Sequence, residues 1–195
     1  MMTHLFLILT ALSALFSALE QKVMVADFTL TVSTSSNAQD PGATYPGTVT
    51  MRGRQFRFSM LGTQAAYDGA TLYVYDEDVD EVTLSTPTEE ELVEANPLLL
   101  AQRIEELCEV SERPVNPTED GSDILAVFTP KEATKLPFTR LTLRIKAGAE
   151  PLPVSLEMKE PNQTTLLKLL NASYTDAAPD FTLSPSGAYI NDLRE

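Results

Sequence analysis

Hydrophobic and polar residues alternate one by one along five stretches of the chain. In residues 28–33, Phe28, Leu30 and Val32 are separated by threonine and followed by serine. The same alternation occurs in residues 48–51, 56–60, 140–145 and 154–159. A period of two residues predicts β-strands that each have one apolar and one solvated face.

Turn-forming residues join several of these stretches over short distances. Asp68-Gly69 predicts a tight hairpin between residues 65–67 and 71–75. Residues 148–151 link two alternating stretches, and residues 160–163 (EPNQ) link the next pair. Connections this short predict an antiparallel meander, because parallel neighbours need a long crossover.

One region departs from the two-residue period. Thr88 followed by Glu91 is the pattern of a helix capping box, and apolar residues at helical spacing continue to about Cys108. Pro97 divides this region into two short helices. Cys108 is expected to be a small buried hydrophobic residue. Residues 111–122 (SERPVNPTEDGS) are expected to form a polar loop.

An apolar face on every strand needs a covering layer, and two short helices are too small to cover the whole sheet. The sheet is therefore expected to curl on itself. This predicts an α+β fold in which a strongly curved antiparallel sheet, with short helices as a lid, encloses an apolar hollow. A hollow of this kind suits an apolar ligand.

The first residues suggest export. Residues 5–18 (LFLILTALSALFSA) carry no charge and end in small side chains. This run is shorter than the roughly 20 residues of a membrane span and is typical of a secretory signal peptide. We expect a signal peptide at residues 1–18, cleaved after Ala18, and one domain at residues 19–195. The alternatives are an uncleaved anchor or a buried first helix.

Composition excludes several classes of function. The formal net charge is −14, which disfavours nucleic acid as a partner. The single Cys108 excludes a cysteine-rich zinc site, and His4 is the only histidine. Residues 76–80 begin like a calcium loop but lack its glycine and final glutamate. No nucleophile motif is present, so we expect neither an enzyme nor a bound metal or cofactor.

Four groups of segments carry a resemblance to a known family. They are residues 26–30 (ADFTL); residues 47–53 (GTVTMRG) with 56–60 (FRFSM); residues 67–75 (YDGATLYVY) with 81–83 and 96–97; and residues 180–183 (DFTL) with Gly187 and 190–194 (INDLR). In order and spacing, over nearly all of residues 26–194, the chain resembles the outer-membrane lipoprotein carrier proteins, the LolA-like family.

The resemblance implies a fold and a role. The fold is an unclosed antiparallel β-barrel with a lid of short helices. The role is that of a periplasmic carrier in a Gram-negative bacterium. Such a carrier receives acylated lipoproteins from an inner-membrane ABC transporter, shields their acyl chains and passes them to an outer-membrane acceptor. We expect a monomer, with no cofactor and no enzymatic activity.

Strand parity and the resemblance together predict the residues that contact acyl chains. They are Phe28, Leu30, Val49, Met51, Phe56, Phe58, Met60, Leu92, Leu98, Leu99, Leu141, Leu143, Leu156 and Met158. The family also has a basic residue that latches the lid, and either Arg52 or Arg54 matches its position. Family members usually begin with an amphipathic helix, for which only residues 19–25 remain after the expected cleavage.

Other functions compete with the carrier. A lipid-sensing or adaptor domain of similar shape, regulating an envelope protein, is the main alternative. The outer-membrane acceptor would need a lipidated N-terminal cysteine, which this chain lacks. A hydrolase would need a nucleophile motif or a histidine in the mature chain.

Overall fold

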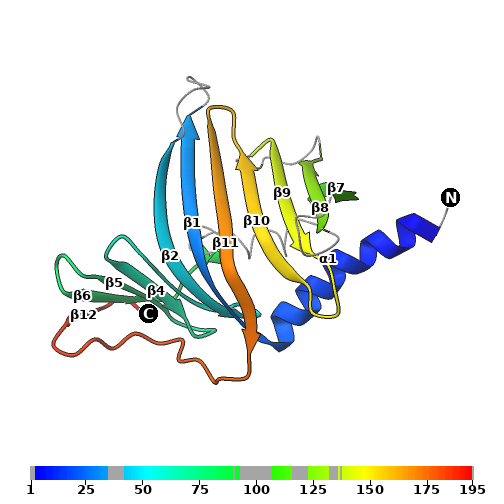
Figure 1. Ribbon diagram of the computed structural model, residues 1–195. Helices are drawn as coiled ribbons and strands as arrows, with labels where there is room; N and C mark the ends of the chain where they lie inside the picture. The colour runs from blue at the N-terminus through cyan, green and yellow to red at the C-terminus, as the bar shows by residue number, and fades with distance from the viewer. Residues whose placement is uncertain are drawn as a thin grey trace.

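The computed structural model consists of one large curved sheet with a long helix on its concave side (Figure 1). It describes residues 3–34, 42–89, 91–92, 107–115, 123–131, 136 and 138–194, with side chains in the first helix described from residue 11 onward. The elements are α1 (Thr3–Gln21), β1 (Val23–Thr34), β2 (Ala43–Arg52), β3 (Gln55–Met60), β4 (Thr63–Tyr67), β5 (Leu72–Asp76), β6 (Glu81–Ser85), β7 (Cys108–Val115), β8 (Asp123–Pro130), β9 (Arg140–Lys146), β10 (Leu152–Lys159), β11 (Gln163–Thr175) and β12 (Tyr189–Asp192).

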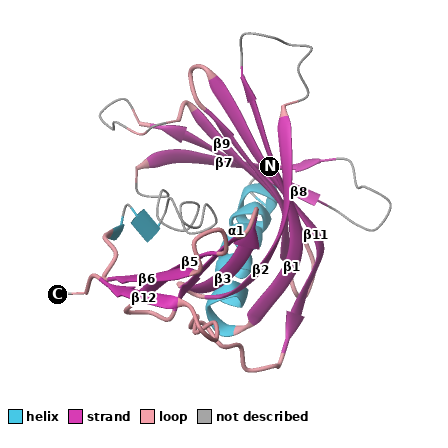
Figure 2. Ribbon diagram, turned by 90° about the vertical axis from the view of Figure 1, so that its left-hand side faces the viewer, coloured by secondary structure: helices cyan, strands magenta, loops and turns pink. Residues whose placement is uncertain are grey.

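The predicted fold class is confirmed. The 12 strands follow the order β12-β6-β5-β4-β3-β2-β1-β11-β10-β9-β8-β7, so β12 and β7 are two free ends and the sheet is unclosed. Neighbours along the sheet are antiparallel, as the short turns predict, except that β12 runs parallel to β6. Figure 2 shows the strands curving around α1.

The predicted turns lie where the sequence places them. The β4–β5 hairpin is built around Asp68, whose Oδ1 accepts hydrogen bonds from the backbone N–H groups of Ala70 and Thr71, both at 2.8 Å. The Tyr73 hydroxyl donates to Oδ2 at 3.0 Å. Burial alone would raise the pKa of Asp68, but these hydrogen bonds lower it below its ordinary value. The charged form of the Asp68 carboxylate therefore stabilises the hairpin.

The prediction of a polar loop is wrong for residues 111–115, and residues 116–122 lie outside the described part of the chain; Cys108 is buried, as expected, but begins a strand rather than ending a helix. The expected end of a helix and start of a polar loop form β7, which pairs with β8 from Cys108 opposite Pro130 to Val115 opposite Asp123. The strand is at the free end of the sheet, and most of its residues are exposed. The strand therefore has no apolar face, and its sequence shows no alternation of apolar and polar residues. Pro114 is tolerated because an edge strand has unpaired backbone positions.

The first helix is a second departure from expectation. Residues 19–25 form no separate short helix: α1 continues to Gln21, and β1 begins at Val23. Leu12, Leu15 and Leu19 of α1 are at most 2% exposed and belong to the hydrophobic core. This placement matches the alternative of a buried first helix, while cleavage after Ala18 stays a prediction. Within the described part of the chain, no helix is long and apolar enough to cross a membrane.

A buried ion pair joins two strands near the β7 end of the sheet. The Asp123 side chain on β8 is 4% exposed, and its Oδ2 accepts a hydrogen bond from Arg144 Nε on β9 at 2.6 Å. Asp123→Ala would leave Arg144 without this carboxylate, although the guanidinium is 29% exposed and can regain some water. We expect a loss of about 1–3 kcal/mol in the free energy of unfolding.

Chemical denaturation of the Asp123→Ala variant measures this loss. Glu157→Ala is the matched control, because Glu157 pairs with Lys159 at the surface, where side chains are 36% and 46% exposed. The control should cost less than about 1 kcal/mol. Equal losses in the two variants would show that the burial of Asp123 adds nothing to the contribution of the ion pair to the free energy of unfolding.

Candidate functional site

The predicted contact residues lie together on the concave side of the sheet. Eight belong to the buried hydrophobic core and four are partly buried side chains packed against it. The eight are Phe28, Val49, Met51, Phe56, Leu92, Leu141, Leu143 and Leu156; the four are Leu30, Phe58, Met60 and Met158. Leu98 and Leu99 lie outside the described residues. One apolar surface therefore extends across strands from both halves of the sheet.

The pairing registers show how this surface is continuous. Leu30 on β1 is opposite Leu167 on β11, which is opposite Leu156 on β10, and Leu156 is opposite Leu143 on β9. Residues directly opposite each other in neighbouring strands point to the same face. An apolar row therefore crosses four strands without a polar interruption.

On β1 and β3, apolar side chains of the concave face are less buried the farther they lie from the C-terminal end of α1. On β3, Phe56 is next to the β2–β3 turn and fully buried, whereas Phe58 and Met60 are progressively farther along and partly exposed. On β1, Met24 is fully buried and Leu30, farther along, is partly exposed. The concave surface is thus filled near the C-terminal end of α1 and leaves apolar side chains in contact with solvent toward the other end.

The helix α1 covers the end of the concave surface where the apolar side chains are fully buried. It contacts β2 and also β7, β8 and β9, which are on the other side of β1, β10 and β11 in the sheet. Figure 2 shows it inside the curve of the sheet. The backbone N–H of Gly53, in the β2–β3 turn, donates to the Leu19 carbonyl at 2.6 Å. This hydrogen bond fixes the C-terminal end of the helix over the turn.

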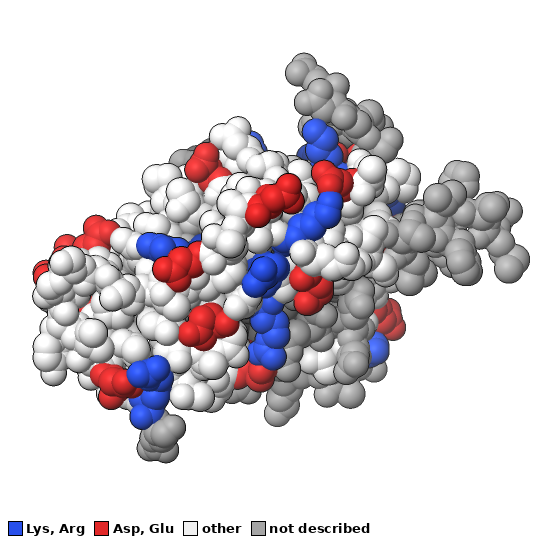
Figure 3. Space-filling view, turned by 90° about the horizontal axis from the view of Figure 1, so that it is seen from below, with Lys and Arg blue, Asp and Glu red and all other residues white. Residues whose placement is uncertain are grey.

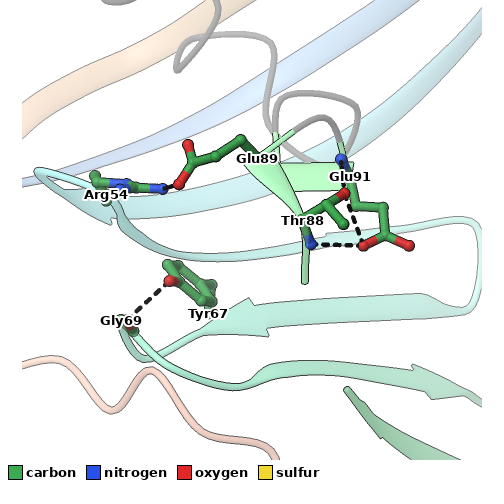
Figure 4. A network of polar contacts seen from close by, with 6 residues as sticks. All are labelled: Arg54, Tyr67, Gly69, Thr88, Glu89 and Glu91. Atoms are coloured by element: carbon green, nitrogen blue, oxygen red, sulfur yellow. Dashed lines mark hydrogen bonds and ion pairs between the residues drawn. The ribbon is translucent and has the colours of Figure 1, made fainter. Parts of the chain in front are cut away.

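The predicted helix start at Thr88 has the expected capping box. The Thr88 N–H donates to Glu91 Oε2 at 2.7 Å, and the Glu91 N–H donates to Thr88 Oγ1 at 3.3 Å (Figure 4). The hydrogen bond from the Thr88 backbone lowers the pKa of Glu91. Leu92 is 2% exposed and belongs to the hydrophobic core. The beginning of the expected lid is therefore anchored on the same apolar surface.

The two arginines considered as a latch have different partners. Arg54 Nη2 is 2.5 Å from Glu89 Oε1 at the start of the expected lid (Figure 4). Arg52 Nη2 donates instead to Gln55 Oε1 at 2.9 Å, within its own hairpin. Between them, Gly53 has a φ of +55°, a turn conformation that favours glycine. Of these two arginines, Arg54 is the one that connects the β2–β3 turn to the residues that precede Leu92.

Removing this ion pair should loosen the start of the lid without unfolding the protein. Both side chains are 50% exposed, so Arg54→Met should cost at most about 1 kcal/mol. That corresponds to at most about fivefold faster hydrogen exchange of the Leu92 amide, which donates to the Thr88 carbonyl at 3.1 Å. In Arg52→Met, exchange should be unchanged. Equal acceleration in both variants would contradict the assignment to Arg54.

Some residues of this surface were not predicted. Leu167 and Leu169 on β11 are buried in the core cluster. They are in the run 166–170 (LLKLL), where paired leucines conceal the two-residue period. Leu12, Leu15 and Leu19 of α1 were also missed. Their spacing of three and four residues was a detectable helical stripe, but the run around them is apolar enough to indicate a signal peptide.

A half-buried tyrosine lies beside the end of α1. The Tyr174 hydroxyl donates to the Pro151 carbonyl at 2.6 Å, and Lys22 Nζ, which pairs with Glu150, is 5.6 Å from the ring centroid. Burial, and to a smaller extent Glu150, raise the pKa of Tyr174 to about 12. The strands β1 and β11 and the β9–β10 turn therefore meet around a protonated phenol.

This pKa predicts a specific loss of stability in alkali. The folded-state pKa is above the unfolded value of about 10. The stabilising contribution is therefore complete below about pH 10 and is lost as the pH rises toward 12. Unfolding measured between pH 9 and pH 12 should show a steeper loss in the wild-type chain than in Tyr174→Phe. Parallel curves for the two proteins would contradict the prediction.

Charged groups are mixed rather than segregated on the face seen from below. Figure 3 shows Lys and Arg beside Asp and Glu on this face, with no large area of one sign. A binding surface for a nucleic-acid backbone would instead gather basic side chains. The face drawn therefore presents no concentrated basic surface to a nucleic-acid backbone.

Comparisons with known proteins show the fold. The sequence matches no protein-family model and no curated protein. Among solved structures, the chain is similar to an uncharacterized conserved protein from Thermus thermophilus, with a TM-score of 0.58 and 14% identity over 94% of this chain and 98% of that chain. Lower scores relate it to the lipoprotein LppX of Mycobacterium tuberculosis (TM-score 0.49, 9% identity, 88% of this chain and 96% of that chain) and to a DUF1329 family protein from Desulfovibrio piger (TM-score 0.47, 9% identity, 93% and 98%).

Proposed function

We propose that this protein is a periplasmic carrier that binds the acyl chains of lipoproteins on the concave face of its sheet and ferries them from the inner to the outer membrane. The observation that carries the proposal is the group of partly exposed apolar side chains Leu30, Phe58, Met60 and Met158, which lie against a fully buried core. Their exposure leaves apolar surface on the concave face that an apolar ligand can cover.

The chemistry of an acyl chain fits this surface. Such a chain offers no hydrogen bonds, so its receptor needs only apolar contacts that exclude water. Each buried methylene contributes about 0.8 kcal/mol, so a chain of roughly 16 carbons gains about 12 kcal/mol on leaving water. Met60 and Met158 suit a surface that rearranges between empty and occupied states, because methionine is flexible and polarizable. The proposed activity is non-enzymatic.

The proposed cycle has a donor and an acceptor. An inner-membrane ABC transporter would supply the acylated lipoprotein, and an outer-membrane acceptor would receive it. This part of the proposal rests on the resemblance to LolA-like carriers in residues 26–194. The Arg54–Glu89 pair, which holds the start of the lid at the surface, would open when the acyl chains enter.

Release of lipoproteins from membranes tests the proposal directly. Inner-membrane vesicles that contain a labelled acylated lipoprotein and the ATP-driven releasing transporter are mixed with the purified protein. We expect soluble lipoprotein to accumulate in a complex with the protein. Lipoprotein that stays on the vesicles would refute transport, and acyl binding without release would favour the lipid-sensing or adaptor domain.

Export can be tested separately. We propose that residues 1–18 act as the leader. Cleavage after Ala18 would remove Leu12 and Leu15, two buried residues of α1, and leave Leu19 at the new N-terminus. The intact mass of the protein recovered from the periplasm decides between a chain that begins at Leu19 and one that keeps α1. Recovery from the cytoplasm alone would refute export.

A further inference from the structure

We propose that the concave face ends in a polar rim that binds the uncharged ester or amide carbonyls of an acylated ligand, so that the protein prefers neutral acyl esters to lipids with a charged head. The polar rim consists of Tyr45 on β2 and of Gln163 and Thr165 on β11. This inference rests on the proposed function, because it concerns the polar end of the same acyl ligand. It adds the chemical class of that end and the side chains that recognise it.

The pairing registers place the polar rim at the open end of the concave face, where apolar side chains are in contact with solvent. Tyr45 is directly opposite Leu30, and Thr165 is directly opposite Met158 on β10, so both share the concave face. Gln163 is two residues from Thr165, at the start of β11, and therefore points to the same face. In Figure 1 the β10–β11 turn lies at the opposite end of the sheet from the junction of α1 with β1.

Along β2 and β11 the concave face changes from apolar to polar toward this end. On β11 the buried Leu169 and Leu167 are followed, toward the open end, by the partly exposed Thr165. On β2 the buried Val49 lies farther from the open end than the partly exposed Tyr45. An acyl ester has the same order of groups, because its hydrocarbon chain ends in a carbonyl. A ligand whose chain covers the apolar rows therefore brings its carbonyl groups to the polar rim.

The polar rim offers hydrogen-bond donors. Gln163 Nε2 donates to Thr165 Oγ1 at 3.3 Å, so the proton of the Thr165 hydroxyl is available for another acceptor. Among the described residues, none accepts a hydrogen bond from the Thr165 hydroxyl or the Tyr45 hydroxyl. A ligand carbonyl that leaves water needs such a donor, because an unpaired buried carbonyl weakens binding. The two hydroxyls can each supply one.

The described strands place no cation beside these donors. Each basic residue of these strands points to the convex face, because it is next to a concave residue in its own strand or opposite another convex residue. These residues are Arg52, Arg57, Arg113, Arg140, Arg144, Lys146, Lys159 and Lys168. A carboxylate or phosphate that left water at the polar rim would therefore gain no opposite charge from the described strands, whereas an uncharged carbonyl needs none.

Three ligands that differ at one end test this specificity. Dodecane, methyl laurate and laurate have hydrocarbon chains of similar length and end in a methyl group, a neutral ester and a carboxylate. Each is titrated into purified protein loaded with the uncharged dye N-phenyl-1-naphthylamine, and displacement of the dye is followed by fluorescence. We expect methyl laurate to bind at least about tenfold more tightly than laurate, because the carboxylate would lose water without gaining a cation.

Thr165→Val separates the polar rim from the apolar surface, because it removes the hydroxyl and keeps the shape of the side chain. It should weaken the binding of methyl laurate about fivefold, the effect of one neutral hydrogen bond, and leave the binding of dodecane unchanged. Tyr45→Phe should have the same selective effect. Thr164→Val is the matched control: Thr164 is the adjacent residue, opposite Lys159 on the convex face, and its variant should bind all three ligands like the wild-type protein. Denaturant unfolding shows that the variants are folded.

The outcomes separate this inference from the carrier proposal. If Thr165→Val and Tyr45→Phe bind methyl laurate like the wild-type protein, or lose affinity for dodecane equally, the polar rim is refuted and the carrier proposal stands. If laurate binds the wild-type protein as tightly as methyl laurate does, the preference for uncharged ends is refuted. If none of the three ligands displaces the dye from the folded wild-type protein, both proposals fail.

Discussion

Phe56→Ala is expected to lower the free energy of unfolding by about 3–5 kcal/mol, the range for removing a large aromatic side chain from a packed core. Phe56 is fully buried, and its ring centroid is 6.3 Å from that of Phe58 and 6.1 Å from that of Tyr67. It is beside the β2–β3 turn, where α1 ends, so the cavity would open at the filled end of the concave face. Denaturant unfolding followed by circular dichroism measures the loss.

Ile190→Ala is the matched control for Phe56. Ile190 on β12 is 59% exposed, so its truncation should change stability by less than about 1 kcal/mol. A Phe56→Ala loss as small as that of the control would show that the filled end is loosely packed. It would then also remove the contrast between filled and open ends on which the proposed site depends.

Phe58→Glu is expected to weaken binding of a fluorescent fatty acid by at least about a hundredfold, which corresponds to about 3 kcal/mol of binding free energy. Phe58 is partly exposed in the absence of ligand, so a carboxylate is tolerated there by the empty protein. An acyl chain packed on the same surface would remove water from that carboxylate without offering it a partner. Fluorescence titration gives the affinity.

Two variants show whether this loss is specific. Leu170→Glu introduces the same charge at an exposed position of β11, next to the buried Leu169 and therefore on the other face of the sheet, and it should bind normally. Phe58→Leu keeps an apolar side chain and should retain most of the affinity. Wild-type affinity in Phe58→Glu, or an equal loss in Leu170→Glu, would place the ligand elsewhere.

The sequence predicted those parts of the fold that local chemistry determines. Alternation assigned the correct face to Phe28, Met51 and Leu143, since side chains two apart on a strand share a face. The hairpin at Asp68-Gly69 and the capping box at Thr88 were also confirmed, because each depends on residues at most three apart. These signals are local and were therefore visible without the fold.

The missed parts depend on distant contacts or on exposed positions. The strand β7 has little apolar surface to alternate, and β12 pairs in parallel with a strand more than 100 residues earlier in the sequence. The packing of α1 against the core was not predicted, because an apolar run with small residues also indicates a leader, which stays a prediction. Whether an apolar residue is fully or only partly buried also depends on where α1 lies. Strand parity alone therefore could not predict that Phe56 is fully buried whereas Phe58 is partly exposed.

The two unjoined ends of the sheet have a mechanical consequence. At the β12 end, Asp192 Oδ1 accepts hydrogen bonds from the backbone N–H of Arg194 at 3.1 Å and from its Nε at 2.8 Å. The side chain of Asp192 thus occupies a backbone donor that is then not available to pair with another strand. A ribbon of strands that is not sealed into a cylinder can widen or tighten by small changes of twist, with every ladder bond intact. The curvature of the sheet can therefore change without breaking the strand pairing, and under the proposed function a bulkier acyl group would be accommodated by opening the curve.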